Sequence, residues 1–228
     1  MNRATFNLIY RHMLLYAETG GAHDVTHVER VLYAALDIAR FEENVDPDIL
    51  IAACLLHDIG RPAQAKDPKV DHAAHGAQMA YDFLLSIGWG KAQAEHVRTC
   101  IAAHRFRGAG RHTSVESRIL YDADKLDVCG IIGIARTIAY QGAYCLPLYH
   151  VDENGAAVTE GRAKDDTFFA EYDIKLRRID DSFLTARGKE LAAGRRAAAD
   201  ACVLGLKKEL DIIHRHGALL LQSSLQKL

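Results

Sequence analysis

The chain has 228 residues, of which 49% are hydrophobic and 25% charged, and its formal net charge is -2. This length and composition predict one domain with a hydrophobic core, and the charge argues against a nucleic-acid or acidic-membrane binding protein. The five cysteines are dispersed and never spaced as CxxC, and the apolar runs are too short to span a membrane. We therefore expect a cytoplasmic protein with reduced thiols.

Helical periodicity dominates the first two thirds of the chain, and no run of alternating polar and apolar residues is long enough for a sheet. Pro47 suits the first turn of a helix, and Gly60 and Pro62 mark the end of the same segment. The helices predicted in chain order cover residues 5–16, from 24 or 26 onward, 47–58, 71–86, 91–104, and from 114 onward. We predict an all-α fold.

Residues 147–166 interrupt this pattern. The pair Asn154-Gly155 has turn chemistry, so the segment is expected to form a short hairpin or a loop insertion. Helices are predicted to resume over 167–208 and to end near 214, with the last ten or so residues fraying. No internal repeat or low-complexity linker is present, so we predict a single domain over 1–228, with its core at about 19–210.

The pair His57-Asp58 closes the apolar run 49–56, which carries no charge of its own. Charge at the end of a buried helix is costly unless something compensates it. A divalent metal would do so, because imidazole and carboxylate together suit Mn, Fe, Mg, Co, Ni or Zn. The pair alone is weak evidence, since the chain contains a second one, His23-Asp24.

Two distant residues complete a candidate metal site. His27 adjoins the core stripe of its predicted helix, although a surface or capping histidine would fit the same pattern. Asp124 shares a helical face with Leu120 and Asp127, where the alternative is a solvated acidic face. A site that leaves positions open for water and substrate is what catalysis requires. The predicted ligands are His27, His57, Asp58 and Asp124, and Asp24 or Asp127 is expected to orient a ligand imidazole.

The ligand order H…HD…D resembles that of the HD superfamily of metal-dependent phosphohydrolases. Three further strings, at 23–31, 122–126 and 185–189, are similar to a bacterial subfamily of single-domain HD hydrolases. Some members of that subfamily are manganese-dependent nucleoside-triphosphate pyrophosphohydrolases. The resemblance covers about 19–210, and its motifs are specific for the superfamily but much less so for the substrate. It implies an HD-domain helical bundle.

The resemblance also implies a chemistry. A metal-activated water would cleave a phosphoester or phosphoanhydride bond of a small phosphorylated substrate, with a nucleotide as the leading candidate. Asp58 would combine the roles of ligand and base. In HD proteins with two metals, histidines between the HD pair and the last aspartate bind the second ion, which here points to His75 and His104. Either could instead transfer a proton to a leaving oxygen, and His104 is the candidate catalytic residue of the two.

Five basic side chains are candidates for binding the substrate phosphate, although each could equally be a surface charge. Arg61 is the strongest, because it follows the HD pair by three residues and can bind phosphate through two nitrogens. The others are Lys125 and Arg105, which adjoin predicted site residues, and Lys175 and Lys189, which match basic positions of the subfamily.

Two other functions fit the same residues. Some HD-fold proteins with six ligands hold two irons and are oxygenases, of which myo-inositol oxygenase is one. A non-catalytic nucleotide-binding module is the other alternative, although the intact ligand set argues against a degraded site. The chain contains no GxSxG elbow, GxxxxGK[ST] loop or GxGxxG loop.

Overall fold

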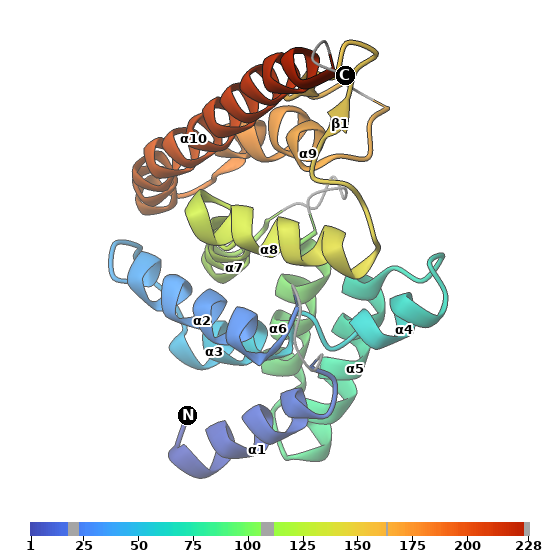
Figure 1. Cartoon of the computed structure of the whole chain (residues 1–228). Helices are drawn as coiled ribbons and strands as arrows, with labels where there is room; N and C mark the ends of the chain where they lie inside the picture. Colours follow the sequence, from blue (N-terminus) through green and yellow to red (C-terminus); the bar gives the residue numbers. More distant parts are fainter. Residues whose placement is uncertain (18–22, 106–111, 163, 226–228) are drawn as a thin grey trace. The chain divides into compact units, whose positions relative to one another are not determined.

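The computed structural model describes residues 1–17, 23–105, 112–162 and 164–225 (Figure 1). Its internal contacts divide the chain into two compact units. The first comprises Met1–Asp127 and Phe183–Leu191, and the second comprises Val128–Ser182 and Ala192–Leu228. The predicted start of the core near 19 lies outside the described residues, and the prediction of a single domain stays a prediction.

The predicted all-α fold is confirmed. Three helices of the first unit begin at an aspartate cap: the carboxylates of Asp24, Asp46 and Asp71 accept hydrogen bonds from backbone N–H groups of the first turn. The helices are α1 (Arg3–Leu14), α2 (Val25–Ala39), α3 (Pro47–Leu56), α4 (Arg61–Lys66), α5 (His72–Ser86), α6 (Lys91–Ala103) and α7 (Val115–Leu126), followed by the start of α10 (Ala186–Leu225). Of these, α4 was not predicted; it carries Pro62 in its first turn, where a missing N–H costs nothing.

Helix α3 lies at the centre of the first unit. It contacts α1, α2, α5, α6 and α7, and seven of its ten residues are buried. A helix that is apolar on all sides is stable only when neighbours surround it, which agrees with this position. Helix α2 also packs against α7, and α5 packs against α6. The end of α3, where the HD pair lies, is therefore enclosed by other helices.

Two glycines bring the start of α5 against the turn that follows α3. A Cβ atom on Gly60 would lie 2.2 Å from the carbonyl oxygen of His72, and one on Gly76 would lie 2.9 Å from the backbone nitrogen of Gly60. No larger residue fits at either position without moving the backbone. The close approach carries His72 toward the HD pair.

The segment 183–191 is tied to α7 by a buried carboxylate. Asp122 accepts hydrogen bonds from the backbone nitrogens of Leu184 and Thr185 and from the hydroxyl of Thr185. Thr185 Oγ1 in turn accepts from the backbone nitrogen of Gly188 in the first turn of α10. Burial raises the pKa of Asp122 above its ordinary value. These contacts account for two of the strings that resemble the HD subfamily.

The second unit contains α8 (Gly130–Ala143), α9 (Phe168–Ile174), a 3-10 helix (Leu176–Ser182) and most of α10. The hairpin expected near 147–166 is present: strands β1 (His150–Val151) and β2 (Ala157–Val158) pair antiparallel, with Gly155 at positive φ in the turn. Helix α10 continues to Leu225, so the predicted end near 214 was wrong. Its last turns are rich in leucine, which favours helix.

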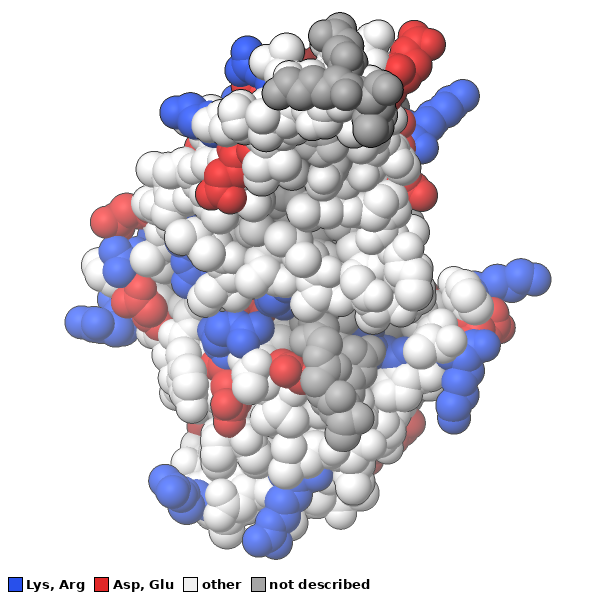
Figure 2. Space-filling model, viewed as in Figure 1, with Lys and Arg blue, Asp and Glu red and all other residues white. Residues whose placement is uncertain are grey.

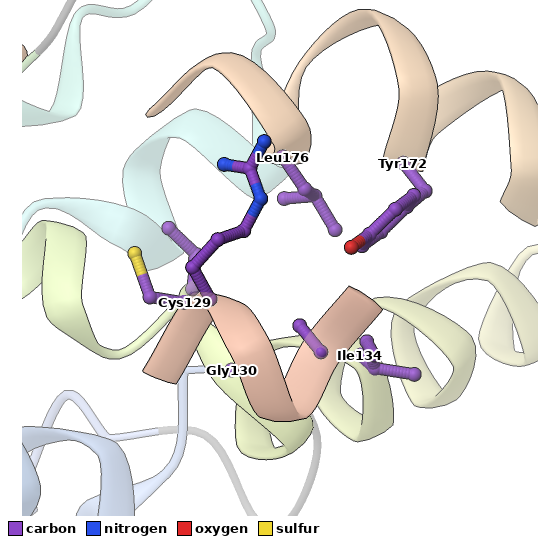
Figure 3. Close-up of a pocket in the computed structure, with 8 residues that line it drawn as sticks. Cys129, Gly130, Ile134, Tyr172 and Leu176 are labelled. Atoms are coloured by element: carbon purple, nitrogen blue, oxygen red, sulfur yellow. The ribbon is translucent and has the colours of Figure 1, made fainter. Parts of the chain in front are cut away.

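Phe168, Phe169 and Val203 belong to the core of the second unit, which α8, α9 and α10 build. A small pocket beside this core is lined by residues that include Cys129, Ile134 and Tyr172 (Figure 3). Its lining contains no histidine and no carboxylate. It therefore offers no group of metal ligands.

The described helices include none long and apolar enough to cross a membrane. Figure 2 shows positive and negative side chains interspersed on the face viewed, without a continuous basic stripe. This distribution matches the small net charge of the sequence.

Candidate metal centre

The ends of five helices of the first unit place the candidate ligands. His57 and His104 are the C-terminal caps of α3 and α6, and Asp124 lies in the last turn of α7. His27 lies in the first turn of α2, and His72 is the first residue of α5. All four histidines are buried. A helix end can aim a side chain along its axis, so these segments converge although they are distant in sequence.

One group of ligand atoms comes from His27, His57 and Asp124. The Nε2 atoms of His27 and His57 lie 3.3 Å apart, and His27 Nε2 lies 3.6 Å from Asp124 Oδ1. Ligands about 2.1 Å from a common ion lie roughly 3.0–3.4 Å from one another. The His27–His57 spacing falls within this range and the His27–Asp124 spacing is slightly wider, so a small closure would gather these atoms around one ion.

A second group comes from Asp58, His72 and His104. Asp58 Oδ1 lies 3.7 Å from the Nε2 atoms of both His72 and His104. The other carboxylate oxygen, Oδ2, lies 3.5 Å from His27 Nε2 and 3.6 Å from His57 Nε2. The Asp58 carboxylate thus stands between the two groups, with one oxygen toward each.

Hydrogen bonds fix the tautomers of the two capping histidines. His57 Nδ1 lies 2.7 Å from the carbonyl oxygen of Cys54, and His104 Nδ1 lies 2.6 Å from that of Ile101. A carbonyl can only accept, so Nδ1 must carry the proton in both rings. Both accepting carbonyls lie in the last turns of their helices, three residues before the histidine. Each ring therefore presents an Nε2 lone pair to the centre of the site.

His27 is oriented by Asp127, as the sequence predicted for one of two acids. Its Nδ1 lies 2.7 Å from Asp127 Oδ2, and Arg30 donates two hydrogen bonds to the same carboxylate at 2.6 and 3.0 Å. Asp24 has a different role: its carboxylate accepts from the backbone nitrogen of His27 and caps α2. It touches the backbone of the ligand residue and not its ring.

Burial sets the charge state of the cluster. It lowers the pKa of His57 to about 4, and burial with the nearby Arg61 lowers that of His72 to about 3. Burial alone would raise the pKa of Asp58, but His57 and Arg61 outweigh it and hold the pKa well below its ordinary value. At neutral pH His57 and His72 are therefore neutral and Asp58 is ionised, which are the forms that bind metals.

The site contains more acceptors than the protein can satisfy. The Nε2 atom of His72 is buried without a hydrogen-bond partner among the described residues. The inward lone pairs of His57 and His104 face the Asp58 carboxylate, which also only accepts. A divalent cation would relieve this accumulation of lone pairs, so the residues present fit a metal.

The predicted phosphate-binding residues fall into different surroundings. Arg61 Nε donates to Asp58 Oδ1 at 2.9 Å, and Lys125 Nζ donates to Asp124 Oδ2 at 2.8 Å, so both lie beside ligand carboxylates. Arg105 donates to Asp71 on α5. Lys189 is exposed on α10, and Lys175 is exposed in the second unit, where it pairs with Glu171. Only Arg61 and Lys125 contact a proposed ligand.

His75 does not join the cluster. It is exposed on α5, whereas His72, one turn earlier, faces the buried side with Ala73, Gly76 and Ala77. Sequence analysis also missed His23, whose Nδ1 lies 3.0 Å from Asp58 Oδ2. The signal for His72 was available, because it lies four residues before Gly76 and so on the same helical stripe.

A small recess adjoins the cluster on the side of α1. It is lined by Met13, Tyr16, Ala17, His23, Val28, Leu55, Asp58 and Ile59. Most of these side chains are apolar, while His23 and Asp58 link the recess to the ligands. The recess therefore combines an apolar wall with two residues of the cluster.

The metal-free protein is expected to lose stability as the pH falls from about 6.5 to 4. Folding lowers the pKa of His57 to about 4 and that of His72 to about 3. In this pH window the two imidazoles are therefore protonated in the unfolded chain but neutral in the native state. Each histidine then removes about 1.4 kcal/mol of unfolding free energy per pH unit. Urea unfolding in a chelator at several pH values measures the slope, and a flat profile would show that these rings are not buried and neutral.

The fold and the site define an all-α protein with a buried histidine–aspartate centre suited to a divalent ion. Residues 24–129 match the model of the HD domain family. The chain is 32% identical to YpgQ of Bacillus subtilis over 201 residues, which cover 86% of this chain and 88% of YpgQ. The chain therefore belongs to the HD superfamily.

Solved structures agree with this assignment. The crystal structure of Bacillus subtilis YpgQ in complex with ADP superposes with a TM-score of 0.69 and 27% identity, covering 90% of this chain and 97% of YpgQ. An HD-superfamily hydrolase from Bacillus thuringiensis superposes with a TM-score of 0.67 and 27% identity, covering 91% of this chain and 97% of its own. HD domains bind divalent metals, and the described cluster is compatible with that role.

Proposed function

We propose that this chain is a metal-dependent phosphohydrolase that cleaves a phosphoester or phosphoanhydride bond of a small phosphorylated compound, with nucleotides as its substrate class. The observation that carries the proposal is the convergence of His27, His57, Asp58 and Asp124 on one space, with Arg61 and Lys125 at its edge. The ADP complex of YpgQ supports a nucleotide. The free thiols of all five cysteines support a reducing compartment such as the cytoplasm.

Different residues of the centre would contribute different parts of the hydrolysis. When bound, a divalent ion lowers the pKa of water and polarises a phosphoryl oxygen. Asp58 holds the ion and is placed to accept a proton, and His104 is placed to transfer one to a leaving oxygen. Arg61 uses its Nε to bond Asp58, which leaves its two terminal nitrogens for phosphate oxygens. Lys125 offers a second positive charge beside Asp124.

The direct test is a substrate screen. Metal-free protein is reloaded with Mn²⁺ and offered nucleoside triphosphates, dinucleoside polyphosphates and nucleoside monophosphates, with release of phosphate or pyrophosphate as the readout. Turnover of at least one class is expected. Binding of nucleotide by the metal-loaded protein without hydrolysis over hours would instead favour a non-catalytic nucleotide-binding module.

A second ion is also part of the proposal, with Asp58, His72 and His104 as its ligands. The orientation of the Asp58 carboxylate favours it, because each oxygen faces a different group of imidazoles. Two ions would also permit the other reading, a di-iron oxygenase. Elemental analysis with an electronic spectrum separates these: a mixed-valent di-iron signal supports the oxygenase, and a colourless protein with Mn or Mg supports the hydrolase.

Arg61→Ala is expected to lower kcat/KM by about 30-fold while the ion at His27, His57 and Asp124 stays bound. The loss corresponds to about 2 kcal/mol for charge-assisted hydrogen bonds to phosphate. The matched control is Arg98→Ala, which removes an arginine that pairs with Glu95 on α6. Equal kinetics in the two variants would show that Arg61 does not contact the substrate.

A further inference from the structure

Gln64, on the short helix α4, hydrogen-bonds to a ring of the metal centre and to the backbone of the turn before α5. Its Oε1 lies 2.8 Å from His72 Nδ1, and its Nε2 lies 3.2 Å from the carbonyl oxygen of Val70. Neither Gln64 nor Val70 was singled out by the sequence. Both lie in the first unit, as does the rest of the centre.

The two contacts determine where the protons lie. The Val70 carbonyl can only accept, so the atom of the Gln64 amide that faces it must be the NH₂ group. The atom that faces His72 is then the amide oxygen, which also only accepts. His72 Nδ1 must therefore carry the proton, and its Nε2 must carry a lone pair.

The lone pair on His72 Nε2 faces the Asp58 carboxylate. His72 Nε2 is buried, has no hydrogen-bond partner among the described residues, and lies 3.7 Å from Asp58 Oδ1. His104 Nε2, whose lone pair is fixed by its own bond to Ile101, lies at the same distance from the same oxygen. Three acceptors thus face a common space, and a change of His72 tautomer would replace one of them by an N–H.

We propose that Gln64 is a positioning residue that holds His72 as its Nδ1–H tautomer and so keeps Nε2 available to an ion bound by Asp58 and His104. The inference rests on the proposed second ion of the preceding section. It assigns a role to the turn 67–70 as well, because the Val70 carbonyl sets the orientation of the amide. A hydrogen-bond partner of this kind typically changes metal affinity about 10–100-fold.

The first test reads the tautomer in the metal-free protein, by ¹⁵N NMR of the histidine rings. The wild type is expected to show His72 protonated at Nδ1. Gln64→Leu is expected to lose this preference, and Gln64→Glu, which keeps an acceptor toward Nδ1, is expected to restore it. Gln78→Leu is the control, because Gln78 is exposed on α5 and donates to Asp82 on the same helix. An unchanged His72 spectrum in Gln64→Leu overturns the proposal.

The second test measures metal binding by calorimetric titration with Mn²⁺. Gln64→Leu should weaken one ion about 10–100-fold and leave the ion at His27, His57 and Asp124 unchanged. In a His72→Ala background the same substitution should have no further effect, since its action passes through that ring. Additive losses overturn the proposal. Neither measurement depends on turnover, so failure of the proposed hydrolysis would not decide it.

Discussion

Asp58→Ala is expected to remove metal binding from both groups of ligands and to lower hydrolysis by about 10³-fold or more. The side chain is 6% exposed, and its two oxygens lie 3.5–3.7 Å from the Nε2 atoms of four histidines. Asp124 is a poor replacement for it, because its Oδ1 lies 3.6 Å from His27 Nε2 and its Oδ2 is paired with Lys125. Metal content after dialysis and the rate of hydrolysis measure the two effects, and circular dichroism reports whether the helices remain.

The fold is expected to survive this change. Asp58 lies in the turn after α3, and its side chain bonds none of the backbone groups that hold the helices together. Asp82→Ala is the matched control, since it removes a carboxylate from the exposed side of α5. Full metal occupancy in Asp58→Ala would show that the ligand assignment is wrong.

Asp127→Asn is expected to weaken metal binding about 10–100-fold and to lower the free energy of unfolding by about 2 kcal/mol. The buried carboxylate accepts from His27 Nδ1 and from two nitrogens of Arg30. Asparagine has one acceptor oxygen where aspartate has two. If its NH₂ group faces His27, the ring must carry its proton on Nε2, which removes a metal ligand. If it faces Arg30, two donors meet and the guanidinium loses its counter-charge.

The control for this variant is Asp37→Asn. Asp37 also accepts two hydrogen bonds from an arginine, Arg187, but it touches no imidazole. Asp37→Asn should lower the free energy of unfolding by weakening the pair with Arg187, and it should leave the metal affinity unchanged. Equal metal affinities in the two variants would contradict a role for Asp127 in orienting His27.

The residue order H…HD…D could be recognised in the sequence because its members lie in the first or last turns of helices or directly after them. His57-Asp58 follows an uncharged apolar run, and Asp124 follows a buried turn of its helix. His75 was predicted as a ligand of a second ion from the family resemblance and not from its place on a helical stripe. The stripe of Ala73, Ala77 and Ala80 passes through His72 and leaves His75 on the exposed side. Helical periodicity, applied to each histidine of this segment, favours His72 over His75.

The roles of Asp24 and Asp127 could not be separated in advance. Both acids lie close in sequence to a predicted ligand, and either carboxylate could reach an imidazole. The structure separates the two roles. The Asp24 carboxylate caps α2, whereas Asp127, 100 residues from His27, contacts the His27 ring because α2 packs against α7. Contacts of that range depend on how helices pack, which local patterns do not specify.

The sequence by itself determined the all-α class and most helix positions, and it singled out four residues that the structure brings close together, because apolar periodicity and polar residues at helix ends are local properties of a chain. Only the tertiary structure decided that Asp58 faces two groups of imidazoles, that His72 and not His75 lies near it, and that Gln64 contacts the ring of His72. Those facts follow from the close approach of Gly60 to α5 and from packing around α3, which are contacts between segments distant in sequence that local patterns do not specify.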